Sequence, residues 1–344
     1  MSVATGARPL RVSWFVPVKH RDYDRMSASV WIRCLQLLPW LERHGVHGSV
    51  NDPDVDADIA VFIRMQGADA YRLAQEQKRR GRRVVFDLVV NYFEEADVPG
   101  LGRPVTERHV QECLRMLDVA DAVTCASAFI ASRAAERHAR AVYLPDSVNP
   151  EHFRYVKPRG DFFRERLRAI WSGYAAKAGE LAPLLPLLRE RGIDLAIVSE
   201  KAPRLTVPGF LFRRRFGFGY VPWRYATFPE SILRGELCLG SRALDTSYNL
   251  GHSIFKIGVF MAQGVPALAS PVPSYAELLG DGSGGRLCVT QDDWVDALDA
   301  VTRDRELLAA WSEGARAKAG PFLTPVVAER YANLFRLLLE GQGQ

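Results

Sequence analysis

The sequence contains no long apolar run. Nowhere do about 18 apolar residues follow one another, the length needed to cross a bilayer as a helix, and residues 1–9 lack the apolar core of a secretion signal. The five cysteines form no CxxC pair and show no spacing typical of a metal site. We therefore expect a cytoplasmic protein with reduced, buried thiols that neither crosses a membrane nor is secreted by a standard signal.

A strong excess of one charge is also missing. Lysine and arginine number 45 against 40 acidic residues, so the formal net charge is +5 over 344 residues. This mild excess is compatible with an anionic small ligand or an anionic membrane surface, and it gives no indication of nucleic-acid binding. The length fits two folded domains, since glycine and proline are not concentrated in any one segment.

Short apolar, β-rich segments alternate with helical patterns along the chain. They are too apolar to face water on either side, which is typical of parallel strands covered by helices on both faces. The sequence thus predicts an α/β protein with two Rossmann-like, doubly wound parallel-sheet domains facing a cleft. The expected strands are 11–18, 58–63, 83–87, 122–125 and 141–144 in the first domain, and 167–171, 194–198, 236–239, 266–269 and 286–289 in the second.

The alternation breaks at 145–166, a polar segment that contains proline. We place the domain boundary there and expect a first domain at 1–150, a second at 151–320 and a C-terminal helix at 321–344. That helix has apolar residues at three- and four-residue steps, so it packs against a hydrophobic surface. A long helix is also expected at 27–44.

Two turns of the second domain are candidates for ligand binding, because open parallel sheets bind ligands outside the carboxyl ends of their strands. At the first turn, Gly173 follows a strand and Lys177 comes four residues later. The spacing fits neither GxGxxG nor the lysine-containing P-loop. Either the backbone approaches a phosphate or sugar here, or the turn is purely structural.

The second turn runs from 244 to 256. Gly251 precedes His252 and Ser253, which predicts a helix start with free N–H groups that favour an anion. Lys256 comes three residues after Ser253, so both side chains are expected on one face of the first helical turn. These donors suit a diphosphate. The alternatives are a helix-capping Ser253, a solvated Lys256 and a surface His252.

The stretch 249–277 resembles the donor-binding segment of bacterial GT-B glycosyltransferases of the glycogen-synthase-like, family 4 type. It carries Ser253-x-x-Lys256, then Met-Ala-Gln-Gly-Val-Pro at 261–266, and ends with Tyr275-x-Glu277. Segments 143–153 and 170–173 are similar to the linker and the glycine turn of that family. The resemblance implies transfer of a sugar from a nucleotide diphosphate sugar to a hydroxyl of a glycan, lipid-linked or small-molecule acceptor, with retention of configuration and without a metal or other cofactor.

The resemblance also implies roles for individual residues. The second domain holds the donor, and the first domain binds the acceptor through loops that follow its strands. Asp87 ends a strand, so it either orients an acceptor hydroxyl and acts as a base or caps the following loop. The donor-side candidates are Gly173, Lys177, Trp223, Asn249, His252, Ser253, Lys256, Tyr275 and Glu277, and the acceptor-side candidates are Arg33, Arg64 and Asn91.

One position departs from the family pattern. Three residues after the lysine, where the family has a ribose-binding glutamate, this sequence has Val259. A valine side chain accepts no hydrogen bond from a ribose hydroxyl. This departure keeps a second hypothesis open, a non-catalytic GT-B domain pair that acts as a scaffold. A nucleotide-sugar epimerase or a phosphorylase on the same fold is a third.

Two other motifs carry weaker hypotheses. The Asp-x-Asp motifs at 52–58 precede a strand instead of following one, so we expect no metal site there. The segment 210–220 sets three arginines, 213–215, between aromatic residues that include Phe210 and Tyr220. It is either an exposed loop beside the donor pocket or a peripheral contact with an anionic membrane face.

Overall fold

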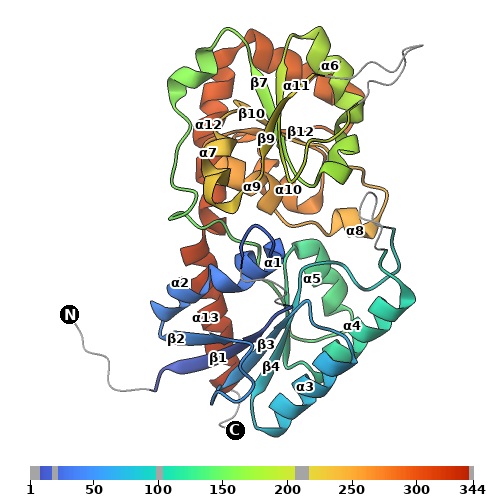
Figure 1. Ribbon diagram of the computed structural model, residues 1–344, viewed down its shortest axis with the longest axis vertical. Coiled ribbons are helices and arrows are strands. Elements are labelled where there is room, and N and C mark those ends of the chain that lie inside the picture. The colour runs from blue at the N-terminus through green and yellow to red at the C-terminus, as the bar shows by residue number, and fades with distance from the viewer. Residues whose placement is uncertain (1–7, 18–21, 98–103, 206–216, 341–344) are drawn as a thin grey trace, which may run out of the picture. The chain divides into compact units, whose positions relative to one another are not determined.

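A computed structural model describes residues 8–17, 22–97, 104–205 and 217–340. These residues form two compact units (Figure 1), each described here by itself. The first unit contains the described residues up to Phe93, Thr106–Ser147 and the chain from Thr324 onward. The second contains Val148–Leu323 and the described part of 94–105.

The first unit is built on a six-stranded parallel sheet with the order β2-β1-β3-β4-β5-β6. After β1, the chain adds β2 on one side of it and then β3 to β6 on the other side. The winding direction therefore reverses between β1 and β3. Such a switch point is where open α/β sheets bind ligands. The strands are β1 (Leu10–Phe15), β2 (Val46–Val50), β3 (Ile59–Ile63), β4 (Arg83–Leu88), β5 (Ala122–Cys125) and β6 (Ala141–Tyr143).

Helices cover both faces of this sheet (Figure 1). In β3, Ile59 and Val61 contribute to one core while Ala60 and Phe62 contribute to the opposite one, as the two-residue period of a strand requires. One face is covered by α1 (Ala28–Val30), η1 (Trp31–Leu35), α2 (Leu38–Glu42) and α13 (Thr324–Glu340), and the other by α3 (Ala68–Arg79), α4 (Glu107–Val119) and α5 (Ala128–Ala135).

The helix expected at 27–44 is interrupted. The chain passes from α1 through the π-helical turn η1 and restarts as α2. Pro39 lies in the first turn of α2, where its missing N–H is tolerated because the first helical N–H groups have no partner within the helix. A single continuous α-helix would have placed this proline in its interior.

The second unit has a six-stranded parallel sheet with the order β12-β11-β10-β7-β8-β9. Counted within the unit, this is the 3-2-1-4-5-6 order of the Rossmann fold, and its switch point lies between β7 and β10. The strands are β7 (Arg168–Ser172), β8 (Asp194–Ser199), β9 (Gly219–Pro222), β10 (Leu237–Gly240), β11 (Ala267–Ala269) and β12 (Gly285–Leu287).

Local capping fixes where several helices of this unit begin. The Thr290 hydroxyl accepts from the Asp293 N–H at 3.2 Å, and the Asp293 carboxylate accepts from the Thr290 N–H at 2.8 Å, a reciprocal cap at the start of α11. The helical segments are η2 (Arg159–Phe163), η3 (Ala175–Leu184), α6 (Leu185–Glu190), η4 (Tyr225–Thr227), α7 (Phe228–Ile232), α8 (Ser247–Leu250), α9 (Phe255–Ala262), α10 (Pro273–Leu279), α11 (Gln291–Arg303), α12 (Arg305–Ala319) and η5 (Gly320–Phe322).

The prediction of two doubly wound parallel-sheet α/β domains is confirmed by these two sheets and the cores on both of their faces. Among the helices of the described ranges, none combines the length and apolar character needed to cross a bilayer.

Candidate functional site

The candidate site of the second unit lies at the switch point of its sheet. Gly173 directly follows β7, and its N–H donates to the Val198 carbonyl at 3.2 Å. A Cβ at this position would come within 2.7 Å of the Trp171 indole ring. The ring leaves no room for a side chain at position 173. This is a structural reason for the glycine, and it fits the purely structural interpretation of the turn. Ser241 and Arg242 follow β10 on the other side of the switch point.

Three cations and one carboxylate gather here. Lys256 Nζ, from α9, lies 3.3 Å from Glu180 Oε2, and Arg242 Nη1 lies 3.5 Å from Glu180 Oε1. Lys256 Nζ also stands 4.7 Å from the centre of the Trp171 ring, a cation–π contact. Lys177, from η3, places its Nζ 5.2 Å from the centre of the Tyr248 ring. We call Lys177, Arg242, Lys256 and Glu180 the cationic cluster.

The electrostatics of the cationic cluster favour an anion. Burial, reinforced by Arg242, lowers the pKa of Lys177 to about 8 and the pKa of Lys256 to about 8. Burial and the same arginine also lower the pKa of His252 well below its ordinary value. The lowered pKa values mean that the protonated lysines are unfavourable so close to Arg242 and so far from water. A bound anion would stabilise these positive charges, so the position favours an anionic ligand. Within the cluster, Glu180 offsets one of the three positive charges.

Polar groups behind the cluster hold it in place. The Asn249 side-chain oxygen accepts from Arg242 Nη1 at 3.1 Å, and its amide donates to Asp245 Oδ1 at 3.2 Å. The Ser274 hydroxyl donates to the His252 carbonyl at 2.6 Å. The buried His252 Nε2 has no hydrogen-bond partner within the described part of the chain.

The expected helix start at His252 is wrong. Gly251 caps the C-terminus of α8, and α9 begins only at Phe255. Ser253 therefore precedes α9, and its hydroxyl accepts a long hydrogen bond of 3.4 Å from the Phe255 N–H. The two side chains of the Ser-x-x-Lys motif do not share one helical turn, although Lys256 still lies in the first turn of α9.

The remaining donor-side candidates lie on other elements. Tyr275, on α10, is fully buried, and burial raises the pKa of its hydroxyl. Glu277, on the same helix, is exposed. Trp223 follows β9 and packs on Phe228 with ring centres 6.1 Å apart. Val259 is buried in the core of the unit, 1% exposed.

The acceptor-side hypotheses for Asp87 and Arg33 need correction. Arg33 Nε donates to Asp87 Oδ1 at 2.7 Å and Arg33 Nη2 to Oδ2 at 2.8 Å. Thr124 and Tyr331 hydroxyls donate to Oδ2 at 2.7 and 2.9 Å. Both ionic side chains are at most 1% exposed. Asp87 is thus held by its neighbours instead of facing a ligand, and its role is structural.

Asn91 and Arg64 differ in exposure. Asn91 is 1% exposed, and its side-chain oxygen accepts from the Phe93 N–H at 3.3 Å, so it orders the loop after β4. Arg64 is exposed at the carboxyl end of β3 and lines a cavity. Of the proposed membrane-contact segment 210–220, residues 210–216 lie outside the described residues. No group of three metal-ligating side chains occurs among the residues that the structure describes.

Sequence reasoning missed Arg242 and Glu180. Arg242 follows the end of a strand at the switch point, which is a signal that the sequence carries. Glu180 has no comparable signal, because it meets Lys256 across 76 positions of the chain.

Comparisons with known proteins identify the fold. No protein-family model matches the sequence. No curated protein matches it. The structure is similar to sucrose-phosphate synthase from Thermosynechococcus elongatus, with a TM-score of 0.69 at 11% identity over 96% of this chain and 100% of that one.

Two more solved structures are similar. HepE from Anabaena, in complex with UDP and glucose, has a TM-score of 0.66 at 12% identity over 95% of this chain and 100% of that one. AviGT4, a glycosyltransferase involved in avilamycin A biosynthesis, has a TM-score of 0.62 at 14% identity over 97% and 99%. The chain therefore has the GT-B fold of these glycosyltransferases, which the family resemblance predicted.

Proposed function

We propose that this protein is a glycosyltransferase that transfers a sugar from a nucleotide diphosphate sugar to a hydroxyl group of an acceptor. In this proposal the second unit binds the donor and the first binds the acceptor. The observation that carries it is the cationic cluster, in which the buried Arg242, the partly buried Lys177 and Lys256 and one carboxylate stand at the switch point of a Rossmann-order sheet. A diphosphate matches that charge and that position.

The chemistry follows from the charges of the cluster. As the bond from the anomeric carbon to the diphosphate breaks, negative charge develops on the leaving oxygen. Lys256 and Arg242 stabilise that charge without reorganising, because Trp171 and Asn249 already hold them in place. The acceptor hydroxyl oxygen forms the new bond to the anomeric carbon, and its proton leaves with the departing diphosphate or to solvent. The family resemblance implies retention of the anomeric configuration, which the NMR coupling constant of the product would establish.

UDP is the first nucleotide to test, since a structural relative was solved with UDP and glucose. Incubation with UDP, GDP and dTDP and with their sugars is expected to raise the melting temperature for one nucleotide series, because a ligand that binds only the folded state stabilises it. Release of the nucleotide in the presence of an acceptor mixture would complete the test. No shift with any nucleotide would contradict the proposal.

A second candidate function rests on Val259. This side chain is buried in the core and has no polar atom, so it cannot take the place of the ribose-binding glutamate implied by the resemblance. A scaffold protein that binds a sugar nucleotide without transfer is therefore the alternative. It predicts a melting-temperature shift with no nucleotide released from any donor and acceptor pair. Measured turnover would exclude it.

Glu180 is expected to compete with the donor. In the ligand-free protein its carboxylate is the counter-ion of both Lys256 and Arg242. Glu180→Gln removes that competing charge, so we expect UDP to bind on the order of fivefold more tightly, the equivalent of about 1 kcal/mol. Isothermal titration calorimetry measures the change.

The matched control is Glu190→Gln on α6, whose side chain is 68% exposed and pairs with Arg191 at 3.7 Å. We expect it to leave UDP affinity unchanged. Weaker UDP binding by Glu180→Gln would instead assign Glu180 a direct contact with the nucleotide.

The affinity for UDP is expected to fall as pH rises from 7 to 9. Lys177 and Lys256 have pKa values of about 8 in the free protein, and a bound diphosphate favours their protonated forms. Above that pH, binding must first add a proton to each lysine, at a cost of up to about tenfold in affinity per lysine and pH unit. Calorimetry at pH 7, 8 and 9 measures this slope.

The control for the pH dependence is Lys256→Arg. Arginine keeps its charge over this range, so the variant is expected to show a shallower fall than the wild type. A wild-type affinity that does not change between pH 7 and 9 would contradict the assignment of these lysines to the diphosphate.

A further inference from the structure

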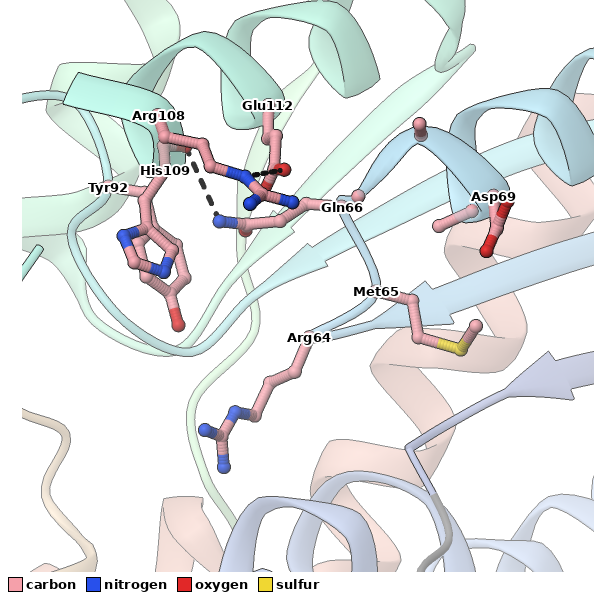
Figure 2. Close-up of a pocket in the computed structure, with 11 residues that line it drawn as sticks. Arg64, Met65, Gln66, Asp69, Tyr92, Arg108, His109 and Glu112 are labelled. Atoms are coloured by element: carbon pink, nitrogen blue, oxygen red, sulfur yellow. Dashed lines mark hydrogen bonds and ion pairs between the residues drawn. The ribbon is translucent and has the colours of Figure 1, made fainter. Parts of the chain in front are cut away.

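A cavity in the first unit is not explained by the cationic cluster. It has a volume of about 530 Å³ and is shown in Figure 2. Its walls come from the loop after β3, the start of α3, the loop after β4 and the first turns of α4. It therefore lies at the carboxyl edge of the sheet, beside the switch point between β1 and β3, where open α/β sheets bind small molecules.

Arg64 stands at the head of this cavity, directly after β3. Its backbone adopts φ 53, in the left-handed region that favours glycine. Among the described residues, the one other non-glycine residue with a positive φ is Asn51, and asparagine tolerates that region far better than arginine does. The chain thus keeps an arginine side chain where glycine would fold with less strain, which points to a role for the guanidinium.

The partners of this guanidinium are neutral. Arg64 donates to the Ser27 and Ser29 hydroxyls, and the Tyr92 hydroxyl lies beside it. No ion pair of Arg64 with a carboxylate is found within the residues that the structure describes. Its positive charge is therefore not paired with a carboxylate in the described ranges.

The acidic residues of the same cavity have cations of their own. Glu112 Oε1 accepts from Arg108 Nε at 2.8 Å, as Figure 2 shows. Asp69 is 92% exposed and pairs with Arg72. These two carboxylates are neutralised locally, so the charge that remains for a ligand is the positive one of Arg64.

One wall of the cavity is aromatic. The rings of Tyr92 and His109 stack with centres 6.3 Å apart and an angle of 22° between their planes. In Figure 2, Gln66 lies beside this aromatic pair, and its amide donates to the His109 carbonyl at 3.4 Å. An aromatic face beside a few polar groups is typical of sites for small polar ligands with an apolar ring face, such as saccharides.

We propose that this cavity binds an acceptor saccharide that carries an anionic group, a carboxylate or a phosphate. The anion pairs with the Arg64 guanidinium and the sugar ring lies against Tyr92. This inference rests on the proposed function, because it identifies the class of the acceptor.

The test compares D-glucuronate, glucose 6-phosphate, uncharged glucose and inorganic phosphate as ligands of the full chain, with affinities from saturation-transfer NMR. Both charged sugars are expected to bind about tenfold more tightly than glucose and than inorganic phosphate. The tighter of the two identifies the anion as a carboxylate or a phosphate. The key variant is Arg64→Gly, which is expected to lose the preference for charge while its melting temperature stays equal or rises, since glycine relieves the left-handed φ.

Arg79→Ala is the matched control. Arg79 lies at the end of α3, the helix whose first residues line the cavity. It is 72% exposed and pairs with Glu76 at 2.8 Å, and the Arg79→Ala variant is expected to keep the preference for charged sugars. Equal binding of glucose and the charged sugars, tight binding of inorganic phosphate alone, or a preference that survives in Arg64→Gly would each overturn the proposal.

UDP binding, measured in parallel, separates the two proposals. If wild type and Arg64→Gly bind UDP but neither prefers charged sugars, the acceptor inference is wrong and the donor proposal stands. If the charge preference depends on Arg64 but none of UDP, GDP, dTDP and their sugars binds, the glycosyltransferase proposal is wrong and the cavity remains a saccharide site.

Discussion

Lys256→Ala is expected to weaken UDP binding by about 10- to 100-fold, the loss typical of a buried hydrogen bond to a charged group. Lys256 Nζ stands between Glu180, 3.3 Å away, and the Trp171 ring, so its charge is held at one point before any ligand arrives. Alanine removes the charge and leaves the backbone of α9 in place. Calorimetric titration with UDP measures the effect.

The control for this variant is Lys201→Ala. Lys201 is exposed just after β8 in the same unit, so its replacement removes an equal charge at a different place and is expected to leave UDP affinity within about twofold of the wild type. The melting temperature of Lys256→Ala should stay close to the wild-type value, because the lysine is partly exposed. If a properly folded Lys256→Ala protein binds UDP as tightly as the wild type, the cationic cluster is not part of the donor site.

Asp87→Ala is expected to lower the free energy of unfolding by about 3–5 kcal/mol, the cost of leaving a buried charge without its partner. Arg33 is 1% exposed and pairs with both Asp87 oxygens, at 2.7 and 2.8 Å. Its remaining ionic partner in the described chain is Asp146, at 2.9 Å. Urea unfolding followed by far-UV circular dichroism measures the change against the wild type.

Two comparisons identify the cause of that loss. Asp69→Ala removes a 92% exposed carboxylate and is expected to change stability by less than about 0.5 kcal/mol. The double variant Asp87→Ala, Arg33→Met removes both charges of the buried pair and is expected to recover part of the loss, since the carboxylate that then loses its arginine, Asp146, is 12% exposed and so less buried than Arg33. A small loss of stability for Asp87→Ala would mean that the carboxylate is not needed for folding. Asp87 would then again be a candidate for the catalytic base.

Most strands could be predicted because they are buried on both faces. β3 is a continuous apolar run and β4 has an apolar centre at Val84-Val85-Phe86, and such runs bounded by polar residues predict central parallel strands. β2 and β9 could not be predicted in the same way. Both are edge strands with several exposed positions, so their apolar signal is weak.

The sequence predicts the candidate site only where its residues are close to one another along the chain. Lys177 and Lys256 follow from glycine turns and from a family motif that can be seen within a few residues. The Glu180 pairing and the Arg33–Asp87 ion pair join segments 76 and 54 positions apart, and nothing in either segment specifies the other. The sequence therefore indicated which charges to consider, and the tertiary structure determined which of them are neutralised.

The contact between Tyr331 and Asp87 has a consequence for synthesis on the ribosome. Tyr331 donates to the buried carboxylate at 2.9 Å, and its helix α13 covers the face of the sheet that holds Trp14. The residues of α13 leave the ribosome after those of the second unit. While the second unit is translated, the first unit therefore lacks α13 on this face of its sheet, although α1, η1 and α2 are already available to cover the rest of it.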